Sequence, residues 1–243
     1  MKRKNYSKTT KGWFGEWSNE YDNTLGNISH HQGLLDLVVT LSDVKDNSKI
    51  LDIGCGTGLL SLKFLQSADC FIVGIDVSKE MLSIFKNKID KLNLKKKITC
   101  KSMDAASLKF NNNTFDIVAS TVTLHHLKEK QRPLRKIYNI LKPGGKLIIG
   151  DIDMDTTGSL VDITRFKRIC KVLEDEWFSA LRDVGVKAFE RMFDNGKKHI
   201  LNDGEYCISF KQWKSLCQKA NFKKVSIKSL HSFKWFKVLV AFK

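Results

Sequence analysis

Three alternating glycines are the first feature of this chain that could support chemistry. Gly54, Gly56 and Gly58 follow a short apolar run and open a helical pattern. Side chains at these positions would keep a ligand away from the backbone and from the helix N-terminus. Asp76, eighteen residues after Gly58, ends the next apolar run, where a carboxylate can accept hydrogen bonds from both hydroxyls of a ribose. The G-x-G-x-G spacing is one residue tighter than the dinucleotide fingerprint, which favours a nucleoside without phosphates.

The segment around this loop resembles a known family. Residues 51–58, Leu-Asp-Ile-Gly-Cys-Gly-Thr-Gly, are similar to the first motif of the class I S-adenosylmethionine-dependent methyltransferases. The resemblance covers about residues 45 to 150, agrees more weakly near 213–225, and is strongest to the group containing the ubiquinone and menaquinone biosynthesis methyltransferases. It implies the fold and the cofactor S-adenosyl-L-methionine, with S-adenosyl-L-homocysteine as product, and says little about the acceptor. The other matching segments are Val73–Ser78, Met103–Ala105, Phe115–Val118, Leu124–Leu127 and Leu141–Gly145.

The resemblance also implies cofactor contacts along the first four strands. Asp52 would hold the glycine loop and reach the amino group of the cofactor through water, while Asp76 would bind the ribose. Asp104 would contact the adenine edge, although it could instead cap a short helix, and Met81 could instead belong to the core. The remaining implied contacts are Gly54, Cys55, Gly56, Gly58, Val77, Ala105, Ser120 and Thr121.

Two adjacent histidines are candidates for acid–base chemistry. A sulfonium already activates its methyl group, so the protein must mainly align the reacting atoms and exclude water. A base is needed only when the acceptor carries a proton of high pKa. His125 and His126 follow the fourth apolar run, whose carboxyl end faces the ligand in such sheets. They could anchor the loop, or one of them, His125 before His126, could be the base.

Acidic and aromatic side chains elsewhere leave further alternatives open. Asp151, Asp153 and Asp155 alternate after the fifth apolar run and could form a polar loop, a base or a metal site. The metal motif of catechol-type methyltransferases is not evident, and we expect no bound metal. Trp13-Phe14, Trp17 and Tyr21 fall on one face of an expected N-terminal helix. That face could pack the helix as a lid, or bring Tyr21 to the cofactor and the tryptophans to an apolar acceptor.

The chain between residues 49 and 150 alternates short apolar runs with helical patterns, which indicates a parallel sheet covered by helices. Lys142–Gly145 indicates a turn, and a helical pattern beyond it continues past Gly185 to a turn at Asn195-Gly196. The expected strands are 49–54, 70–76, 98–100, 114–120, 146–150, 223–230 and 235–242. We expect four helices around the sheet. One ends near residue 66, one begins at Ser78, and the other two span 128–141 and 210–220.

These elements predict an α/β fold, a doubly wound, Rossmann-like sheet of seven mostly parallel strands with the last one antiparallel. A single domain accounts for the 243 residues. We divide it into an N-terminal helical cap (1–45), a cofactor-binding core (46–150), a helical insert forming a lid over the substrate (151–209), and a final helix and strand pair (210–243).

Cysteine spacing and apolar content point to a cytoplasmic protein. The six cysteines are scattered without a C-x-x-C pair, which is typical of a reduced compartment and of a chain without a structural metal. No apolar run is long enough for a transmembrane segment. No apolar segment follows the basic start, so we expect no secretory signal.

The net charge of +16 raises the question of nucleic acid. Only seven of the 42 basic residues are arginine, the side chain best suited to paired phosphate and base contacts. The lysines are spread along the chain, and Lys95–Lys97 is the only run of three. Solvated lysine-rich faces are therefore the first interpretation, and a nucleic-acid surface is the alternative.

We therefore expect a methyltransferase that acts on a small-molecule substrate, a partly apolar metabolite, by in-line transfer. One alternative is a methyltransferase acting on RNA or protein. The other is a catalytically silent S-adenosylmethionine-binding protein. The glycine spacing argues against a nicotinamide-dependent oxidoreductase, and the motifs of adenine-amino and cytosine-C5 methylation are absent from the sequence.

Overall fold

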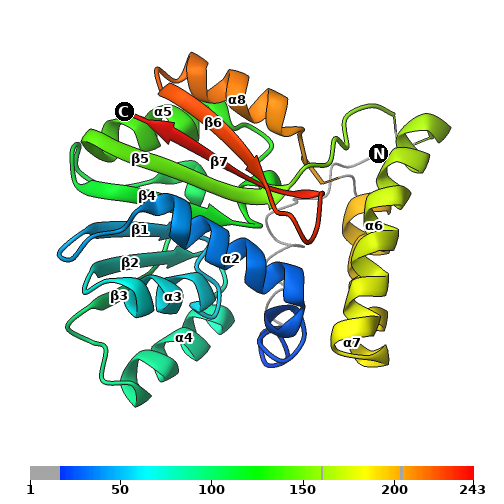
Figure 1. The fold of residues 1–243 in the computed structure, drawn as a ribbon, viewed down its shortest axis with the longest axis horizontal. Helices are drawn as coiled ribbons and strands as arrows, with labels where there is room; N and C mark the ends of the chain where they lie inside the picture. Colours follow the sequence, from blue (N-terminus) through cyan, green and yellow to red (C-terminus); the bar gives the residue numbers. More distant parts are fainter. Residues whose placement is uncertain (1–16, 160, 203–204) are drawn as a thin grey trace.

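The computed structural model describes residues 17–159, 161–202 and 205–243 (Figure 1). Seven strands form one sheet in the order β3-β2-β1-β4-β5-β7-β6. Neighbours run parallel except at β7, which is antiparallel to both β5 and β6. The predicted doubly wound sheet with an antiparallel last strand is therefore confirmed. Its strands are β1 (Lys49–Ile53), β2 (Phe71–Asp76), β3 (Ile98–Ser102), β4 (Phe115–Thr121), β5 (Leu141–Ile152), β6 (Lys223–Ser229) and β7 (Phe236–Phe242).

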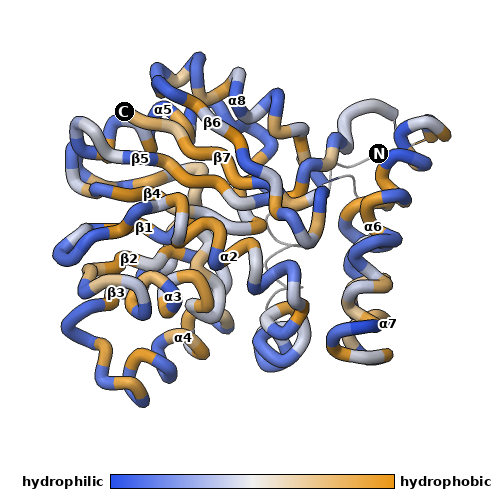
Figure 2. The backbone as a smooth tube through the Cα atoms, viewed as in Figure 1, coloured by the Kyte–Doolittle hydropathy of each residue, from blue (hydrophilic) through white to orange (hydrophobic). Residues whose placement is uncertain are grey.

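Two apolar layers cover the sheet because successive side chains of a strand point to opposite faces. Ile50 packs on one face, with α2 (Ser29–Ser42), α3 (Leu59–Ser67) and α4 (Lys79–Lys91). Leu51 packs on the other face, with α5 (Gln131–Ile140) and α8 (Phe210–Lys219). Apolar residues accordingly run along the strands in Figure 2. All the helices expected around the sheet are present, with shifts of a few residues at their ends.

Serine caps fix the start of two of these helices. The side chain of Ser78 accepts a hydrogen bond from the Met81 amide at 3.2 Å, which confirms Ser78 as the N-cap of α4. Ser209 and Gln212 form a reciprocal capping box at the start of α8. Both caps satisfy amides at the helix N-terminus that have no partner within the helix.

The turn expected at residues 142–145 is wrong. These residues lie within β5, where Phe115 pairs with Leu141 but Ile117 pairs with Lys146. Four residues of β5 therefore bulge opposite one residue of β4, and Gly144 adopts a φ of +77° within the bulge. The Pro-Gly-Gly composition indicated a break in regular pairing, but the strand continues through it.

The insert contributes two helices beside the end of the sheet where β5 finishes (Figure 1). α6 (Ile163–Asp183) is separated from α7 (Val186–Asn195) by Gly185 at a φ of +106°, as the interrupted pattern predicted. The turn expected at Asn195-Gly196 is wrong, because the chain continues as the π-helical segment η4 (Gly196–Asn202). Gly196 approaches the Trp177 ring closely, so its lack of a side chain serves packing rather than a turn.

The first described residues pack against this insert. Trp17, Leu25 and Ile28 form a small apolar cluster with residues of α6 and α7. Trp13 and Phe14 lie outside the described residues, and the chain from 18 to 24 forms turns, so Tyr21 is not on a helix. Within the described residues, no helix combines the length and apolar character needed to cross a membrane.

Candidate cofactor and acceptor site

The three glycines of the loop meet different surroundings. A side chain at Gly54 would begin 2.2 Å from the Thr123 side chain, and one at Gly58 would begin 2.1 Å from the Phe85 ring. A side chain at Gly56 would meet nothing within 4 Å, although its φ is also positive at +51°. Two glycines therefore allow the loop to pack tightly against α4 and the segment after β4. The third borders open space.

Asp76 lies next to this open space, at the carboxyl end of β2. Its Oδ2 accepts a hydrogen bond from the Gly56 amide at 2.9 Å, and its Oδ1 accepts one from the Ser78 amide at 2.8 Å. Burial raises the pKa of Asp76, while the backbone amides that donate to it oppose that rise. Val77 beside it is an apolar side chain left 41% exposed. A carboxylate and an exposed apolar surface thus border the same space.

Residues before α2 cover the loop from a distant part of the chain. Thr57 donates its hydroxyl hydrogen to Asp22 at 2.6 Å, and Lys88 pairs with the same carboxylate at 2.5 Å. Burial is the main cause that raises the pKa of Tyr21, followed by the charges of Asp76 and Asp22. The Tyr21 phenol therefore lies in the field of Asp76, near the predicted ribose position.

Asp52 does not hold the glycine loop directly, contrary to the expectation. It is buried beneath the loop and accepts a hydrogen bond from the Ser61 hydroxyl of α3 at 2.6 Å. The loop amides of Gly54 and Cys55 donate instead to the Ile75 carbonyl, at 2.8 and 3.0 Å. Burial raises the pKa of Asp52 to about 7, against the hydrogen bond from Ser61.

Several other predicted contacts have partners of their own within the protein. The Cys55 side chain is buried in the core, and burial raises the pKa of its thiol well above the usual range. Ser120 donates its hydroxyl hydrogen to the Ile53 carbonyl at 2.9 Å, linking β4 to β1. Asp104 accepts from the Ala106 amide at 2.8 Å and so caps a 3-10 turn, while remaining exposed. Met81 is buried on α4.

The carboxyl ends of β1, β2 and β3 nevertheless meet at one edge. The Met103 amide donates to the Asp76 carbonyl at 3.0 Å, which brings the segment of Asp104 next to the end of β2. The open space at Gly56 is thus bordered by the half-buried carboxylate of Asp76, by an apolar side chain and by an exposed acid. This combination fits a nucleoside whose ribose lies on Asp76.

The predicted histidine lies farther along the same edge, between two buried carboxylates. Asp151 of β5 faces His125 Nδ1 at 2.8 Å, and Glu205 from the end of the insert faces Nε2 at 3.4 Å. Glu205 also lies 3.2 Å from His126 Nδ1. The side chains of His125, Asp151 and Glu205 are all buried. The pair of histidines therefore joins the sheet to the insert.

The charges of this cluster favour a protonated His125. Burial alone would lower its pKa, but Asp151 and Glu205 outweigh burial and raise it to about 10. Burial opposes ionisation of Glu205 as well, yet the two histidines hold its pKa well below the usual range. In this geometry His125 must separate from Glu205 before its Nε2 can accept a proton.

The three alternating acids after β5 have separate roles. Asp151 Oδ2 is buried and has no hydrogen-bond partner among the described residues, so one oxygen of this carboxylate remains available beside His125. Asp153 pairs with Lys237 at 2.5 Å and accepts from the Phe210 amide. Asp155 accepts from Thr157 at 2.9 Å. The three acids therefore do not converge on one point.

Glu205 is the buried partner of the two histidines that the sequence does not reveal. It follows a polar segment of the insert, and no periodicity or motif links it to the histidines. The sequence does not indicate Asp22 or Thr123 either, because each contacts the glycine loop only through the tertiary fold. A buried carboxylate opposite a histidine has no signature in a single sequence.

Comparison with known proteins agrees with this geometry. Residues 51–149 match the family model described as a methyltransferase domain. The ubiquinone/menaquinone biosynthesis C-methyltransferase of Blochmanniella floridana is 31% identical over 166 residues, which cover 65% of this chain and 65% of that protein. The 27-O-demethylrifamycin SV methyltransferase of Amycolatopsis mediterranei (strain S699) is 26% identical over 161 residues, covering 63% of this chain and 59% of that protein.

The fold has a counterpart among solved structures. Phosphoethanolamine N-methyltransferase 2 of Haemonchus contortus, in complex with phosphomonomethylethanolamine and S-adenosylhomocysteine, superposes with a TM-score of 0.63 at 17% sequence identity. The superposition covers 87% of this chain and 52% of that one. The similarity to these proteins spans less than two thirds of their length, so it identifies a shared domain and fold.

Proposed function

We propose that the chain, whose residues 51–149 match the methyltransferase-domain family, is a class I S-adenosylmethionine-dependent methyltransferase that transfers a methyl group to a small, partly apolar metabolite. The observation that carries this proposal is the open space beside Gly56, with Asp76 at the end of the next strand. S-adenosyl-L-methionine supplies a methyl group already activated by its sulfonium, so the protein's work is binding, alignment and exclusion of water.

The proposed cofactor contacts follow the edge of the sheet. Asp76 accepts hydrogen bonds from the ribose, and Val77 and Asp104 lie where the adenine would extend. Gly56 leaves room for the methionine part, with Thr121 farther along at the end of β4. Tyr21 closes the space from above the loop, because Asp22 is fixed to Thr57 and Lys88.

The acceptor would lie between His125 and Glu205. Glu205 belongs to the insert and occupies the Nε2 side of His125, so an acceptor that separates the two also frees that nitrogen. Asp151 then keeps Nδ1 protonated and leaves Nε2 facing the acceptor. Without the charge of Glu205 the His125 pKa falls toward the range of a general base. An acceptor that carries no acidic proton would need only the alignment.

The surroundings favour a small acceptor over a macromolecule. Trp17 from the first described residues packs with Ala180 and Met192 of the insert in an apolar cluster, and we propose that this part of the chain covers the edge. A covered, apolar surface of this kind suits a metabolite that must be shielded from water.

All six cysteines are free thiols, and we place the protein in the cytoplasm for that reason.

Titration calorimetry with S-adenosyl-L-methionine tests the cofactor part of the proposal. Asp76→Ala is expected to weaken binding by about 1.5–3 kcal/mol, or about 10- to 150-fold, because a charged acceptor of hydrogen bonds is lost. Asp69→Ala is the matched control, since Asp69 is an exposed acid that precedes the amino end of the same strand. Equal affinities for Asp76→Ala and Asp69→Ala would reject the site.

Turnover tests the acceptor part. The chain is incubated with labelled S-adenosyl-L-methionine and fractionated cell metabolites, and methylated products are identified by mass spectrometry. A labelled small molecule supports the proposal. Label found only in RNA or protein, or bound cofactor with no turnover, would contradict it.

A further inference from the structure

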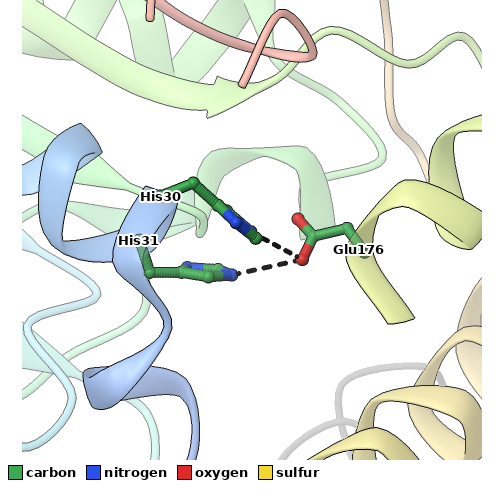
Figure 3. Close-up of side chains that lie close together, drawn as sticks. All are labelled: His30, His31 and Glu176. Carbon is green, nitrogen blue, oxygen red and sulfur yellow. Dashed lines mark hydrogen bonds and ion pairs between the residues drawn. The ribbon is translucent and has the colours of Figure 1, made fainter. Parts of the chain in front are cut away.

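A second cluster of buried polar side chains joins the core to the insert, away from the glycine loop. His30 and His31 lie in the first turn of α2, and Glu176 projects toward them from α6 (Figure 3). The exposed fractions of the three residues are 1%, 8% and 4%. No part of the methyl-transfer proposal uses them.

Both imidazoles face the same carboxylate oxygen. Glu176 Oε2 lies 2.9 Å from His30 Nε2 and 3.5 Å from His31 Nε2. One possible ligand atom from each residue lies within 4.8 Å of those of the other two. Bonds of about 2.0–2.2 Å at tetrahedral angles place neighbouring ligand atoms about 3.4 Å apart. A small outward movement of the carboxylate would therefore admit a metal ion between the three atoms.

The cluster is incomplete as a simple ion pair. His31 Nε2 is buried and has no hydrogen-bond partner among the described residues, although it points at Glu176 (Figure 3). Buried polar atoms without a partner are rare in folded proteins and call for an explanation such as an ion. A metal ion would take the lone pair of this nitrogen and satisfy it.

Packing fixes the direction of the first imidazole independently of Glu176. The His30 ring stacks on Phe233 with centroids 4.0 Å apart and an interplanar angle of 11°. Phe236 meets the same ring edge-on at 5.2 Å. Because apolar rings hold His30, its Nε2 would keep facing the cluster if the carboxylate moved. Such preorganisation is what a ligand on a rigid element requires.

We propose that His30, His31 and Glu176 bind a divalent transition-metal cation of the Zn²⁺ type, which fixes the insert to the core. Two imidazoles and one carboxylate are a donor set of known zinc sites, with the fourth position left to water. Imidazole ligands favour such cations over Mg²⁺ and Ca²⁺, which prefer oxygen. The ion would connect α2, which packs on the sheet, to α6 of the insert.

A second group in the described residues could compete for the same ion. His125, Glu205 and Cys207 also present ligand atoms within 4.8 Å of one another. This group belongs to the proposed acceptor site, and it differs from the first by its thiol. The difference allows the two groups to be distinguished by spectroscopy.

The first experiment measures Zn²⁺ binding to the full chain after chelator treatment, by calorimetry and elemental analysis without S-adenosyl-L-methionine. One Zn²⁺ per chain is expected, with no binding of Mg²⁺ at the same concentration. Glu176→Gln and His31→Gln should each lower the Zn²⁺ affinity by at least about tenfold, since even loss of an outer contact has that effect. His231→Gln, an exposed histidine, and Cys207→Ser are the matched controls and should leave it unchanged.

The second experiment uses Co²⁺ as a spectroscopic probe. The proposed site predicts a visible spectrum of nitrogen and oxygen ligands, without the near-ultraviolet charge-transfer band of a thiolate. A thiolate band that disappears in Cys207→Ser would place the metal in the other group and overturn the proposal. Unchanged Zn²⁺ affinity in Glu176→Gln and His31→Gln, or no Zn²⁺ binding at all, would also overturn it.

Thermal unfolding guards against variants that are merely misfolded. Zn²⁺ should raise the Tm of the parent chain, because a ligand that binds only the folded state stabilises it, and should not raise the Tm of folded Glu176→Gln. A Tm increase of equal size in both would contradict the site. These measurements need neither cofactor nor acceptor, so their failure is separate from failure of the methyl-transfer proposal.

Discussion

The cofactor core and the insert differ in how much polar pairs add to apolar packing. Apolar residues on both faces of the sheet stabilise the core, with Ile50 and Leu51 packing on opposite sides. The insert meets the rest of the chain through apolar residues of α6 and η4 that join the cluster on the Ile50 face, through one smaller apolar cluster, and through several polar pairs. These pairs are His30 with Glu176, Ser29 with Asp183, Glu20 with Arg191, Asp175 with Trp235, and His125 with Glu205.

The difference indicates how the two regions should respond to change. Apolar contacts of the core depend little on pH or ligands, because they contain no titratable group. Polar pairs at the insert change strength when a partner is protonated, moved or bound to a ligand. The fold therefore combines a rigid cofactor edge with a cover whose attachment can vary. The predictions below test that contrast, from the largest expected effect to the smallest.

The same substitution at two glycines separates packing from ligand binding within the core. Gly58→Asn should prevent stable folding, because its side chain would begin 2.1 Å from the Phe85 ring. Gly56→Asn should fold, because asparagine tolerates a positive φ and nothing lies within 4 Å of the new side chain. It should nevertheless abolish cofactor binding by filling the space. Circular dichroism and calorimetry check the two expectations.

The opposite result would show that the contrast within the loop is wrong. If Gly56→Asn binds S-adenosyl-L-methionine as the parent does, the open space beside Gly56 is not the cofactor site. If Gly58→Asn folds with an unchanged Tm, the close approach of Phe85 does not constrain the loop.

The insert is expected to be a mobile cover over the substrate. Amides of α6 and α7 should exchange hydrogen faster than those of β1 and β4 in the free chain, because several apolar side chains of these helices, including Ile163, Phe178 and Val186, remain exposed. Exchange in residues 17–30 and 161–202 should slow when S-adenosyl-L-homocysteine and an acceptor analogue bind. Hydrogen-exchange mass spectrometry measures both states. Insert amides as protected as the central strands without ligand would exclude a cover that opens.

The contact between His125 and Glu205 predicts a pH-dependent attachment of the insert. The folded-state pKa of His125, about 10, exceeds the value of about 6.5 in an unfolded chain. Its contribution to stability is therefore fully present below pH 6.5 and is lost as pH rises toward 10. The free energy of unfolding of the parent should exceed that of His125→Gln by on the order of 5 kcal/mol near pH 6, since each pKa unit corresponds to about 1.4 kcal/mol, and the difference should shrink across this window.

Comparing parent and variant at each pH isolates the histidine. Burial lowers the pKa of Lys130 to about 8, so the effect of Lys130 on the free energy of unfolding becomes more favourable as pH rises above 8. This effect is present in both chains and therefore cancels in the comparison. Urea unfolding from pH 6 to 10 provides the measurement. A difference that stays constant over this range would mean that His125 is not held as a cation.

The core could be predicted from the sequence because its signals are local. Alternating apolar residues gave the strands, serine marked the start of α4, and the glycine loop with Asp76 indicated the cofactor edge. The bulge in β5 was missed because Pro-Gly-Gly usually ends a strand, whereas here β4 continues to pair on both sides of it. That outcome depends on the neighbouring strand and not on the residues themselves.

The attachment of the insert could not be predicted, because its partners are distant in the chain. His30 and Glu176 are separated by 146 residues, and nothing in either segment specifies the other. Glu205 meets His125 in the same way. Periodicity predicted that α6 and α7 are helices and that Gly185 interrupts them, but not which side chains would meet the core. Such contacts follow from tertiary packing alone.

The smallest effect is expected from the lysines, and it tests whether the charge of +16 serves the reaction. Lys95 and Lys96 precede β3, and Lys223 opens β6, so all three lie at the amino ends of the strands, opposite the cofactor edge. Changing these lysines to glutamate should leave turnover of a metabolite unchanged at low and moderate salt, because charges beyond a Debye length of about 10 Å are screened. Binding to generic RNA should stay weak, with a Kd near 10⁻⁴–10⁻⁶ M. An RNA substrate would instead give affinity that falls steeply with salt and turnover that drops in the variants. Nanomolar binding to a defined RNA would overturn the metabolite proposal.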